Sequence, residues 1–550
     1  FLYSMIKMTY VLDMLTAVIM LVASIALIVV SFVVLKFAIN LSVNEEIREI
    51  GIMKAIGLKD RRIRSLYVIK YMCLGLVGGL IGFAAGIPFS EYLLKAASRS
   101  LVLESSGGIL FPLLSTLAVV IIITAYSYGC TGRIRKYSPL DAIREGQTGE
   151  RFKKKKGLRI SKSHLSTTGY MAVNDIKSSP KRYISVVIAF ALCTSLVLTL
   201  VNTVNTLRSG NLAYAFGKAS DIYFDPTFDP EMDLLSPDTS ESIRLDVEDK
   251  LRQNGYEADC SVDIGYNLVV HFEGKESTIR GMQGVNISTE DLVYYEGVAP
   301  ASANEIAITE IVSNNTGIHI GDYVEITFND TTDTYLVTAY FETMNSMGEC
   351  IRLHEDTDMS GTTPIMIGSF QIDFKDDPDQ AEITDRAEKL KDILNTDNVY
   401  TAAEYVDNTT NSSDTLEGIS YIFLLITIAV VILMSILMER SFISDEKNEI
   451  AIMKAVGFKD SKIVLHHIKR FMYTALIAVV LAVILSIPLT ELCITPIFQG
   501  MGMKSMTFEY NFLQIGLIYP LIVLGFTFVS SGLTSLYTRT ITSRDTASIE

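Results

Sequence analysis

The stretch EEIREIGIMKAIGLKDRRI, residues 45–63, occurs a second time as DEKNEIAIMKAVGFKDSKI at residues 445–463. The two stretches align without a gap at an offset of 400 residues, and 11 of their 19 positions are identical. The same offset pairs the Ile-Pro dipeptides at 87–88 and 487–488 in the segments that follow. Internal repetition of this kind in a membrane protein indicates two pseudo-symmetric halves.

Long uncharged segments surround both copies. Seven runs of 20 or more residues contain no Asp, Glu, Lys or Arg: 14–35, 71–90, 109–132, 184–207, 418–438, 471–490 and 510–538. A helix of that length crosses the roughly 30 Å of a bilayer's hydrocarbon core. The 550-residue chain has 20% charged residues, below the roughly 25% of a soluble protein. These features exclude a soluble enzyme, a nucleic-acid binder and a disulfide-stapled secreted domain.

The charged residues between the runs are unevenly distributed. Residues 207–416 hold 12 Lys and Arg against 41 Asp and Glu, a net charge of −29, so the rest carries +14 of the total of −15. The connection 132–183 holds 14 Lys and Arg against 4 acids. The positive-inside rule makes this connection cytoplasmic. It therefore places 207–416 outside the plasma membrane and gives both repeats the same direction.

We predict an α-helical polytopic membrane protein with seven spans in two parallel repeats and one α+β extracytoplasmic domain. The lipid bilayer is thus its first partner. The predicted spans are about 11–38, 66–94, 109–132, 184–206, 418–438, 470–492 and 510–538. The predicted domains are a first repeat (1–150), a basic cytoplasmic linker with an amphipathic helix (151–183), the span 184–206, the acidic outer domain (207–416) and a second repeat (417–550). By symmetry, we expect that a further span, with or without an outer domain, either precedes residue 1 or was lost.

The outer domain shows both strand and helix patterns. Residues 323–328 and 334–341 alternate as strands around a turn at 329–333, and 379–394 reads as an amphipathic helix. Its acidity fits either the capture of cationic peptides or solubility alone. Cys260 and Cys350 either form one disulfide or remain two separate buried thiols.

The repeated loop between two spans reads as a short helix, a tight turn and a second helix. Ile47, Ile50, Met53 and Ile56 form an apolar stripe, Gly57 fits a left-handed C-terminal cap, and Asp60 fits an N-cap. The loop is either a generic interfacial anchor or a docking element for a partner that binds both halves. The retained Met-Lys-Ala favours docking, with the following candidate residues: Glu46, Glu49, Ile50, Met53, Lys54, Gly57, Asp60, Glu446, Glu449, Ile450, Met453, Lys454, Gly457 and Asp460.

Small residues also coincide in the spans that follow each loop. They are Gly75, Gly78, Gly82 and Gly86 in the first copy and Ala475, Ala478, Ala482 and Ser486 in the second. Small residues three and four apart allow close helix approach. We therefore predict a helix-packing ridge, with gating as the secondary interpretation.

Chemical motifs for catalysis are missing from the sequence. It contains no Gly-x-x-x-x-Gly-Lys-[Ser/Thr] phosphate loop and no Cys or His spacing for a metal. We expect no catalytic residue, cofactor or metal in this chain. The uncharged spans also disfavour a secondary transporter, which usually places charged residues at the membrane midplane.

The loops resemble the inner-loop signature of FtsX-like ABC permeases, the mechanotransmission class that includes MacB and the lipoprotein-release permeases. The resemblance rests on Glu49–Gly57, Glu449–Gly457 and the exit segment Ser138–Arg144. Asn304–Glu310 and Gly317–Asp322 resemble the MacB-like outer core domain. One departure is that the C-terminal exit, 542–545, lacks a counterpart of Pro139 in the first exit.

The resemblance implies a separate, dimeric ATPase subunit that holds ATP and Mg and receives both loops. It implies transmission of ATP-driven movement to the outer domain, acting on a lipid, a lipoprotein or an antimicrobial peptide. The alternative is a regulatory membrane protein that uses the same transmission to control a cell-wall hydrolase or a sensor kinase.

Overall fold

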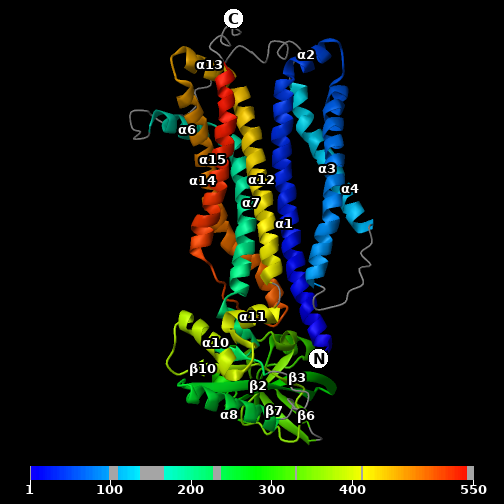
Figure 1. Cartoon of the computed structure of the whole chain (residues 1–550). Helices are drawn as coiled ribbons and strands as arrows, with labels where there is room; N and C mark the ends of the chain where they lie inside the picture. Colours follow the sequence, from blue (N-terminus) through cyan, green and yellow to red (C-terminus); the bar gives the residue numbers. More distant parts are fainter. Residues whose placement is uncertain are drawn as a thin grey trace. The chain divides into compact units, whose positions relative to one another are not determined.

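The computed structural model describes residues 2–97, 110–136, 166–226, 237–328, 331–410 and 413–541. The chain divides into two compact units (Figure 1). The helical unit comprises Met20–Leu200, Gly418–Leu489 and Phe512–Glu550, and the α/β unit comprises Phe1–Ile19, Val201–Glu417 and Thr490–Asn511.

Seven helices are long and apolar enough to cross a membrane, among the residues described, and they confirm the seven predicted spans. They are α1 (Leu2–Glu45), α3 (Asp60–Ala97), α4 (Leu110–Cys130), α7 (Pro180–Leu207), α12 (Ser413–Asp445), α14 (Asp460–Gln499) and α15 (Tyr519–Ser535). The last of these spans also includes the π-turn η6 (Gln514–Ile518) before α15 and the 3-10 turn η7 (Leu536–Thr540) after it. Short helices accompany them: α2 (Ile47–Ala55), η1 (Thr131–Lys136), α6 (Thr167–Ser178) and α13 (Lys447–Ala455).

The second helix of each repeated loop is continuous with the span that follows it. Helix α3 runs without a break from Asp60 to Ala97 and contains Pro88. The prediction of Asp60 as an N-cap is therefore wrong by one position. The backbone oxygen of Lys59 accepts from the amide of Arg62 at 2.8 Å, so Lys59 precedes the helix and Asp60 begins it.

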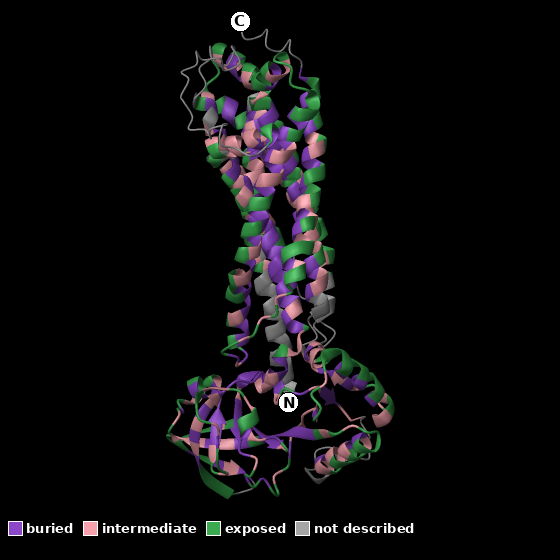
Figure 2. Cartoon of the chain, turned by 90° about the vertical axis from the view of Figure 1, so that its left-hand side faces the viewer, coloured by how far each residue is buried: buried purple, intermediate pink, exposed green. Residues whose placement is uncertain are grey.

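The core of the helical unit is unevenly shared. One apolar cluster joins α1, α7, α12, α14 and α15, including Phe190, Met434, Phe471 and Ala478. In contrast, none of the residues in the most apolar stretch of α3 is buried. In the corresponding stretch of α4, 11% of the residues are buried. Figure 2 shows the helices coloured by burial, with buried, intermediate and exposed residues along their length. Helices α3 and α4 pack on each other, and within these stretches most of their remaining apolar side chains face outward, as in lipid-facing helices.

The α/β unit is built on an 11-stranded sheet. Its strands are β1 (Ile222–Phe224), β2 (Ala258–Phe272), β3 (Lys275–Val285), β4 (Tyr294–Gly297), β5 (Glu305–Ile308), β6 (Tyr323–Phe328), β7 (Thr331–Phe341), β8 (Cys350–Leu353), β9 (Met366–Ile367), β10 (Phe370–Phe374) and β11 (Val399–Thr401). The order is β11-β1-β10-β2-β3-β8-β5-β7-β4, with β6 paired to β2 and β7, and β9 paired to β2. The helices of the unit are α8 (Pro237–Gln253), α9 (Glu310–Thr316), α10 (Gln380–Leu394) and α11 (Ala402–Thr410), with the 3-10 turns η3 (Gly210–Phe216), η4 (Thr289–Asp291) and η5 (Asn345–Gly348).

The long hairpin β2–β3 joins two parts of this sheet. Its register runs from Val262 opposite Val285 to Phe272 opposite Lys275. The two-residue turn between the strands, Glu273-Gly274, is left-handed at both positions, which matches the right-handed twist of the flanking strands. One end of β2 contributes to a core with α8 and α10, and the other end contributes to a core with β5 to β8.

The strand and helix predictions for this domain are confirmed. Strand β6 has the predicted bounds, and β7 contains 334–341 but begins at Thr331. Of the predicted turn, 329–330 lie outside the described residues. Helix α10 begins after Asp379, whose carboxylate accepts from the amide of Glu382 at 2.9 Å as an N-cap. Cys260 and Cys350 are free buried thiols in separate clusters, so the second alternative holds.

Candidate functional site

The two repeated loops, residues 46–60 and 446–460, fold in the same way. Helices α2 and α13 have nine residues each and lie at the same end of the helical unit (Figure 1). Gly57 and Gly457 follow them with φ of 96° and 97°, and each donates its amide to the residue three positions earlier at 3.0 Å. The predicted left-handed caps are confirmed, because only glycine adopts this backbone without a Cβ penalty.

One face of each loop helix is buried in its own repeat. Ile50 and Ile450 are fully buried, and Met53 and Met453 pack partly against the same clusters. Ile50 belongs to an apolar cluster with Ile39, Val43, Ile63, Tyr67, Tyr71 and Ile134. Ile450 belongs to a cluster with Ile443, Ala451, Ile463 and Ile541. These predicted docking residues therefore hold the loop in place from inside.

The repeated lysines tie each loop to the end of its repeat. Lys54 Nζ donates to the backbone oxygen of Ile134 at 2.7 Å. Lys454 Nζ donates to those of Thr538 at 2.9 Å and Ile541 at 2.6 Å. The lysine side chains are only 8% and 12% exposed. Their ammonium groups are thus used within the repeat, where they satisfy carbonyls at a helix end.

The repeated carboxylates are also engaged internally. Asp60 lies 3.0 Å from Lys54, and Asp460 lies 2.9 Å from Lys454. Glu46 accepts from the Tyr67 hydroxyl at 2.6 Å. In the second copy, Arg470 Nη1 donates to both oxygens of Glu446, at 3.0 and 2.8 Å. Of the predicted acidic residues, Glu49, Glu449 and Asp460 are exposed.

The exposed side of each loop carries three apolar residues, the exposed apolar triplets. They are Ile52, Ile56 and Leu58 in the first copy, 46%, 76% and 36% exposed, and Ile452, Val456 and Phe458 in the second, 49%, 75% and 38% exposed. The agreement at all three positions means that both loops present the same apolar surface. Sequence reasoning missed this surface because it assigned Ile56 to the inner stripe. At about 100° per residue, steps of three rotate by 60° each, so Ile56 lies on the side opposite Ile47.

A buried polar cluster occurs in the second half, and sequence reasoning did not predict it. His467 Nδ1 lies 2.7 Å from Glu439, and His466 Nε2 lies 3.1 Å from Asp175 on α6. Arg470 reaches Asp175 at 3.5 Å and is fully buried. At the offset of 400, Glu439 corresponds to Ile39, and His467 to Tyr67. The two halves therefore share their loops but not the polar packing behind them.

The two small-residue ridges also differ. Ala475, Ala478, Ala482 and Ser486 are all fully buried, as a helix-packing ridge requires. In the first copy, a Cβ added at Gly75 would meet Ile123 at 3.5 Å, whereas at Gly78, Gly82 and Gly86 it would meet nothing within 4 Å. Close packing is thus observed for the second ridge and for one position of the first.

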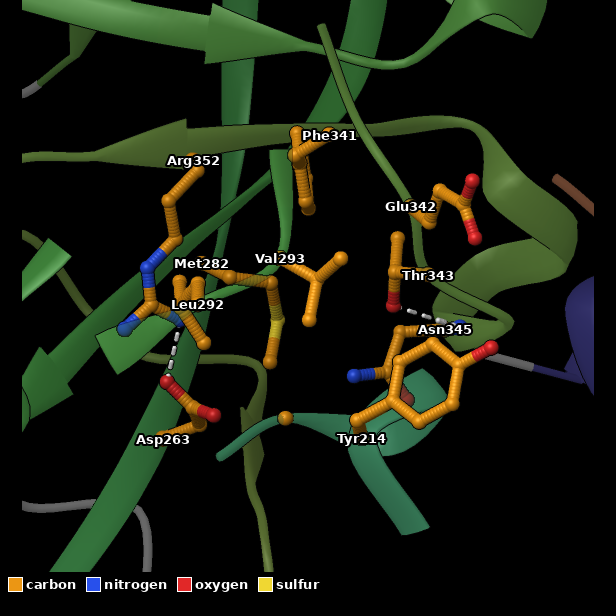
Figure 3. A pocket seen from close by; sticks show the side chains of 11 residues that line it. Tyr214, Asp263, Met282, Leu292, Val293, Phe341, Glu342, Thr343, Asn345 and Arg352 are labelled. Carbon is orange, nitrogen blue, oxygen red and sulfur yellow. Dashed lines mark hydrogen bonds and ion pairs between the residues drawn. The ribbon is translucent and has the colours of Figure 1, made fainter. Parts of the chain in front are cut away.

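The α/β unit contains a small cavity of about 20 Å³ (Figure 3), which leaves room for about one water molecule. Met282, Leu292, Val293 and Phe341 form its apolar wall, and Asp263 and Arg352 form a buried ion pair at one side. Among the described residues, the second oxygen of Asp263 has no hydrogen-bond partner. The opposite wall comes from Tyr214, Glu342, Thr343 and Asn345.

Two like-oriented membrane repeats with matched loops, joined by an α/β unit, define a class of polytopic membrane protein. Residues 21–139 and 419–543 match the family model described as FtsX-like permease C-terminal. Each half of the chain therefore carries one segment that matches the FtsX-like permease family.

A curated relative and a solved structure are also similar to parts of the chain. The relative is the macrolide export ATP-binding/permease protein MacB of Bdellovibrio bacteriovorus, 32% identical over 127 residues. This alignment covers 23% of the chain and 19% of the relative, so the chain spans about a fifth of that protein's length. The structure is the periplasmic region of MacB from Actinobacillus actinomycetemcomitans, with 12% identity and a TM-score of 0.25 over 36% of this chain and 95% of that one.

Proposed function

We propose that this chain is an ABC-transporter permease that works with a separate, dimeric ATPase subunit, which holds ATP and Mg and receives both exposed apolar triplets. The observation that carries the proposal is the equal exposure of the triplets at Ile52/Ile452, Ile56/Val456 and Leu58/Phe458. The buried packing differs between the two halves. If the loops faced only water or lipid, their exposed apolar side chains would be free to differ as well. A two-fold symmetric partner offers the same groove twice and would require this agreement.

The internal contacts of the loops suit them for transmitting force. Lys54 and Lys454 tie the loop helices to the last turns of their repeats, and Ile50 and Ile450 anchor them in apolar clusters. A pull on the exposed triplet would therefore move the repeat as a whole. The loop would act as a rigid docking element because its inner face is already packed against its own repeat.

The charge distribution supports one orientation of the proposed complex. The basic connection 132–183 and the net charge of −29 on 207–416 support cytoplasmic loops and an extracytoplasmic α/β unit in a plasma membrane. ATP-driven movement would then act on a lipid, a lipoprotein or an antimicrobial peptide outside the hydrocarbon core. The charge-free spans support this, since they offer no polar path for a solute.

The test is co-purification of a P-loop ATPase subunit with the tagged chain from its native membrane. The double variant Ile56→Glu, Val456→Glu should lose the ATPase, because it places charge in the centre of an apolar contact. Val298→Glu is the matched control, since Val298 is 73% exposed but lies in the α/β unit. Retention of the ATPase by the double variant at the level of the control would refute docking through the triplets.

A further inference from the structure

The loop after β7, Glu342–Gly348, has an unusual backbone. Ser346, Met347 and Gly348 are successive left-handed residues, with φ of 53°, 61° and 72°. Two of them carry side chains, which makes this conformation costly. Such a segment persists only where its surroundings hold it, and these conformations cluster at functional places. The contacts that hold the loop therefore identify what it serves.

One set of contacts joins the loop to the connection Gly500–Glu509, which directly follows α14. Glu342 is 3% exposed, and its Oε1 accepts from the backbone amide of Ser505 at 2.9 Å and from the Ser505 hydroxyl at 3.0 Å. A carboxylate that accepts a backbone amide inside protein forms a strong, directional bond. Glu342 and Ser505 are 163 residues apart in the chain.

A second contact is made by backbone alone. A Cβ added at Gly502 would lie 2.5 Å from the backbone oxygen of Thr343 and 2.6 Å from Cα of Gly348. A Cβ added at Gly348 would lie 2.6 Å from Cα of Gly502. Two glycines thus allow the loop and the connection to touch without side chains between them. Because no side chain lies between the two segments, a displacement of one backbone is passed directly to the other.

The same connection is also tied to two residues of η3. Tyr214 Oη donates to the backbone oxygen of Ser505 at 3.2 Å, and Asn211 Nδ2 donates to Glu509 at 3.0 Å. Tyr214, Glu342, Thr343 and Asn345 also line the cavity beside Asp263 (Figure 3). Two of the residues that hold the connection, Tyr214 and Glu342, are therefore part of one cavity wall.

We propose that Glu342 is a positioning residue that couples the connection Gly500–Glu509 to the loop Glu342–Gly348. Displacement of the end of α14 then moves the cavity wall directly, in addition to any movement carried by α7 and α12. The energetic coupling stands on the contacts above. Its use in transport rests on the proposed function.

The first experiment measures hydrogen exchange by mass spectrometry on the full-length chain in lipid nanodiscs. Glu342→Ala and Gly502→Ala should both raise exchange in the peptides covering 342–348 and 500–505, on the order of tenfold, because each breaks the same contact. Gly321→Ala is the matched control. Gly321 has φ of 97° against 98° for Gly502, but an added Cβ meets nothing within 4 Å.

A double-variant cycle separates coupling from simple loosening. If the two segments act as one element, the combined Glu342→Ala, Gly502→Ala chain should exchange no faster than either single variant. Glu342→Gln should restore part of the protection, since its amide oxygen still accepts from Ser505. The proposal would be overturned if exchange rose in 500–505 while exchange in the loop at 342–348 stayed unchanged. It would also be overturned if the effects of the two single variants on exchange were fully additive in the double variant.

Ser505 provides an independent variant at an exposed position, in case the glycine variant fails to fold. Ser505→Pro removes the donating amide, whereas Ser505→Ala keeps it. Only the proline variant should raise hydrogen exchange in the loop at 342–348. Equal exchange rates in the proline and alanine variants would count against the contact between Ser505 and Glu342. A last arm adds the ATPase with nucleotide, which should change loop exchange in the native chain but not in Gly502→Ala. Failure of any ATPase to bind the native chain would defeat the proposed function, while the nucleotide-free results still decide the coupling.

Discussion

Arg470 and Lys70 occupy equivalent positions in the two repeats, but Arg470 is fully buried and Lys70 is half exposed. Arg470 Nη1 lies 2.8 Å from Glu446, and its side chain is 0% exposed. Lys70 Nζ lies 3.5 Å from the equivalent Glu46, and its side chain is 50% exposed. The same charge pair is thus a structural contact in one half and a surface contact in the other.

Arg470→Met should destabilise the chain far more than Lys70→Met. Removing one partner of a buried pair leaves the other charge uncompensated, which costs about 3–5 kcal/mol. An exposed pair contributes about 1 kcal/mol or less. Chemical unfolding in a mild detergent measures the difference in the free energy of unfolding. Tyrosine fluorescence can follow it, because the chain contains no tryptophan. Similar losses for both variants would contradict the observed asymmetry of burial.

The cost of replacing the cap glycines should come from the backbone alone. Gly57 and Gly457 have φ of 96° and 97°, and a Cβ at either would meet nothing within 4 Å. Gly457→Ala should therefore cost about 1–2 kcal/mol, the penalty of a left-handed alanine. Gly525→Ala serves as the control, because Gly525 also has open space but lies within α15. That variant should be neutral or stabilising by about 0.5–1 kcal/mol. Equal destabilisation of the two would show that the left-handed backbone is not the cause.

Much of the membrane fold could be predicted because its signals are local in the sequence. Seven charge-free runs gave the spans, and the repeated Gly57 and Gly457 gave the turns. The exposed side of α2 was misassigned because residues three apart were grouped on one face, although each such step turns the helix by about 60° and so places Ile56 opposite Ile47. Exposure of the apolar triplets is decided by which face the rest of the repeat covers.

Contacts between distant segments were beyond the reach of sequence patterns. The bond between Glu439 and His467 joins two spans, and nothing in the uncharged run 418–438 indicates that the next residue turns inward. Likewise, the contact between Glu342 and Ser505 depends on how the sheet and the connection meet within the α/β unit. Pairing of this kind is set by tertiary packing, on which one sequence carries no periodic signal.

The two thiols of the α/β unit should be unreactive in the native chain. Burial raises the pKa of Cys260 and of Cys350 to about 12. Because the thiolate is the nucleophile, alkylation by iodoacetamide at pH 8 should reach neither until the chain unfolds. Val298→Cys supplies a positive control at a 73% exposed position of the same unit. Peptide mass spectrometry that found native labelling of Cys260 at the rate of the control would contradict this placement.

The acid stability of the α/β unit should depend on Asp376. The hydrogen bond from Arg386, which donates Nη1 to Asp376 at 2.8 Å, holds the pKa of this carboxyl below its ordinary value. A carboxyl with a depressed folded pKa contributes stability above its unfolded pKa of roughly 3.9 and loses it as pH falls through the folded pKa.

Asp376→Asn should therefore lower the midpoint of thermal unfolding at pH 7. The difference from the native chain should shrink as pH falls below about 4, where the native carboxyl becomes protonated as well. The effect at pH 7 should be small, because the carboxyl is 59% exposed and solvent screens the pair. Thermal unfolding profiles of both chains between pH 2 and pH 7 measure it. A difference that stayed constant over this range would mean that Asp376 stabilises the unit through shape and hydrogen bonding, not through its charge.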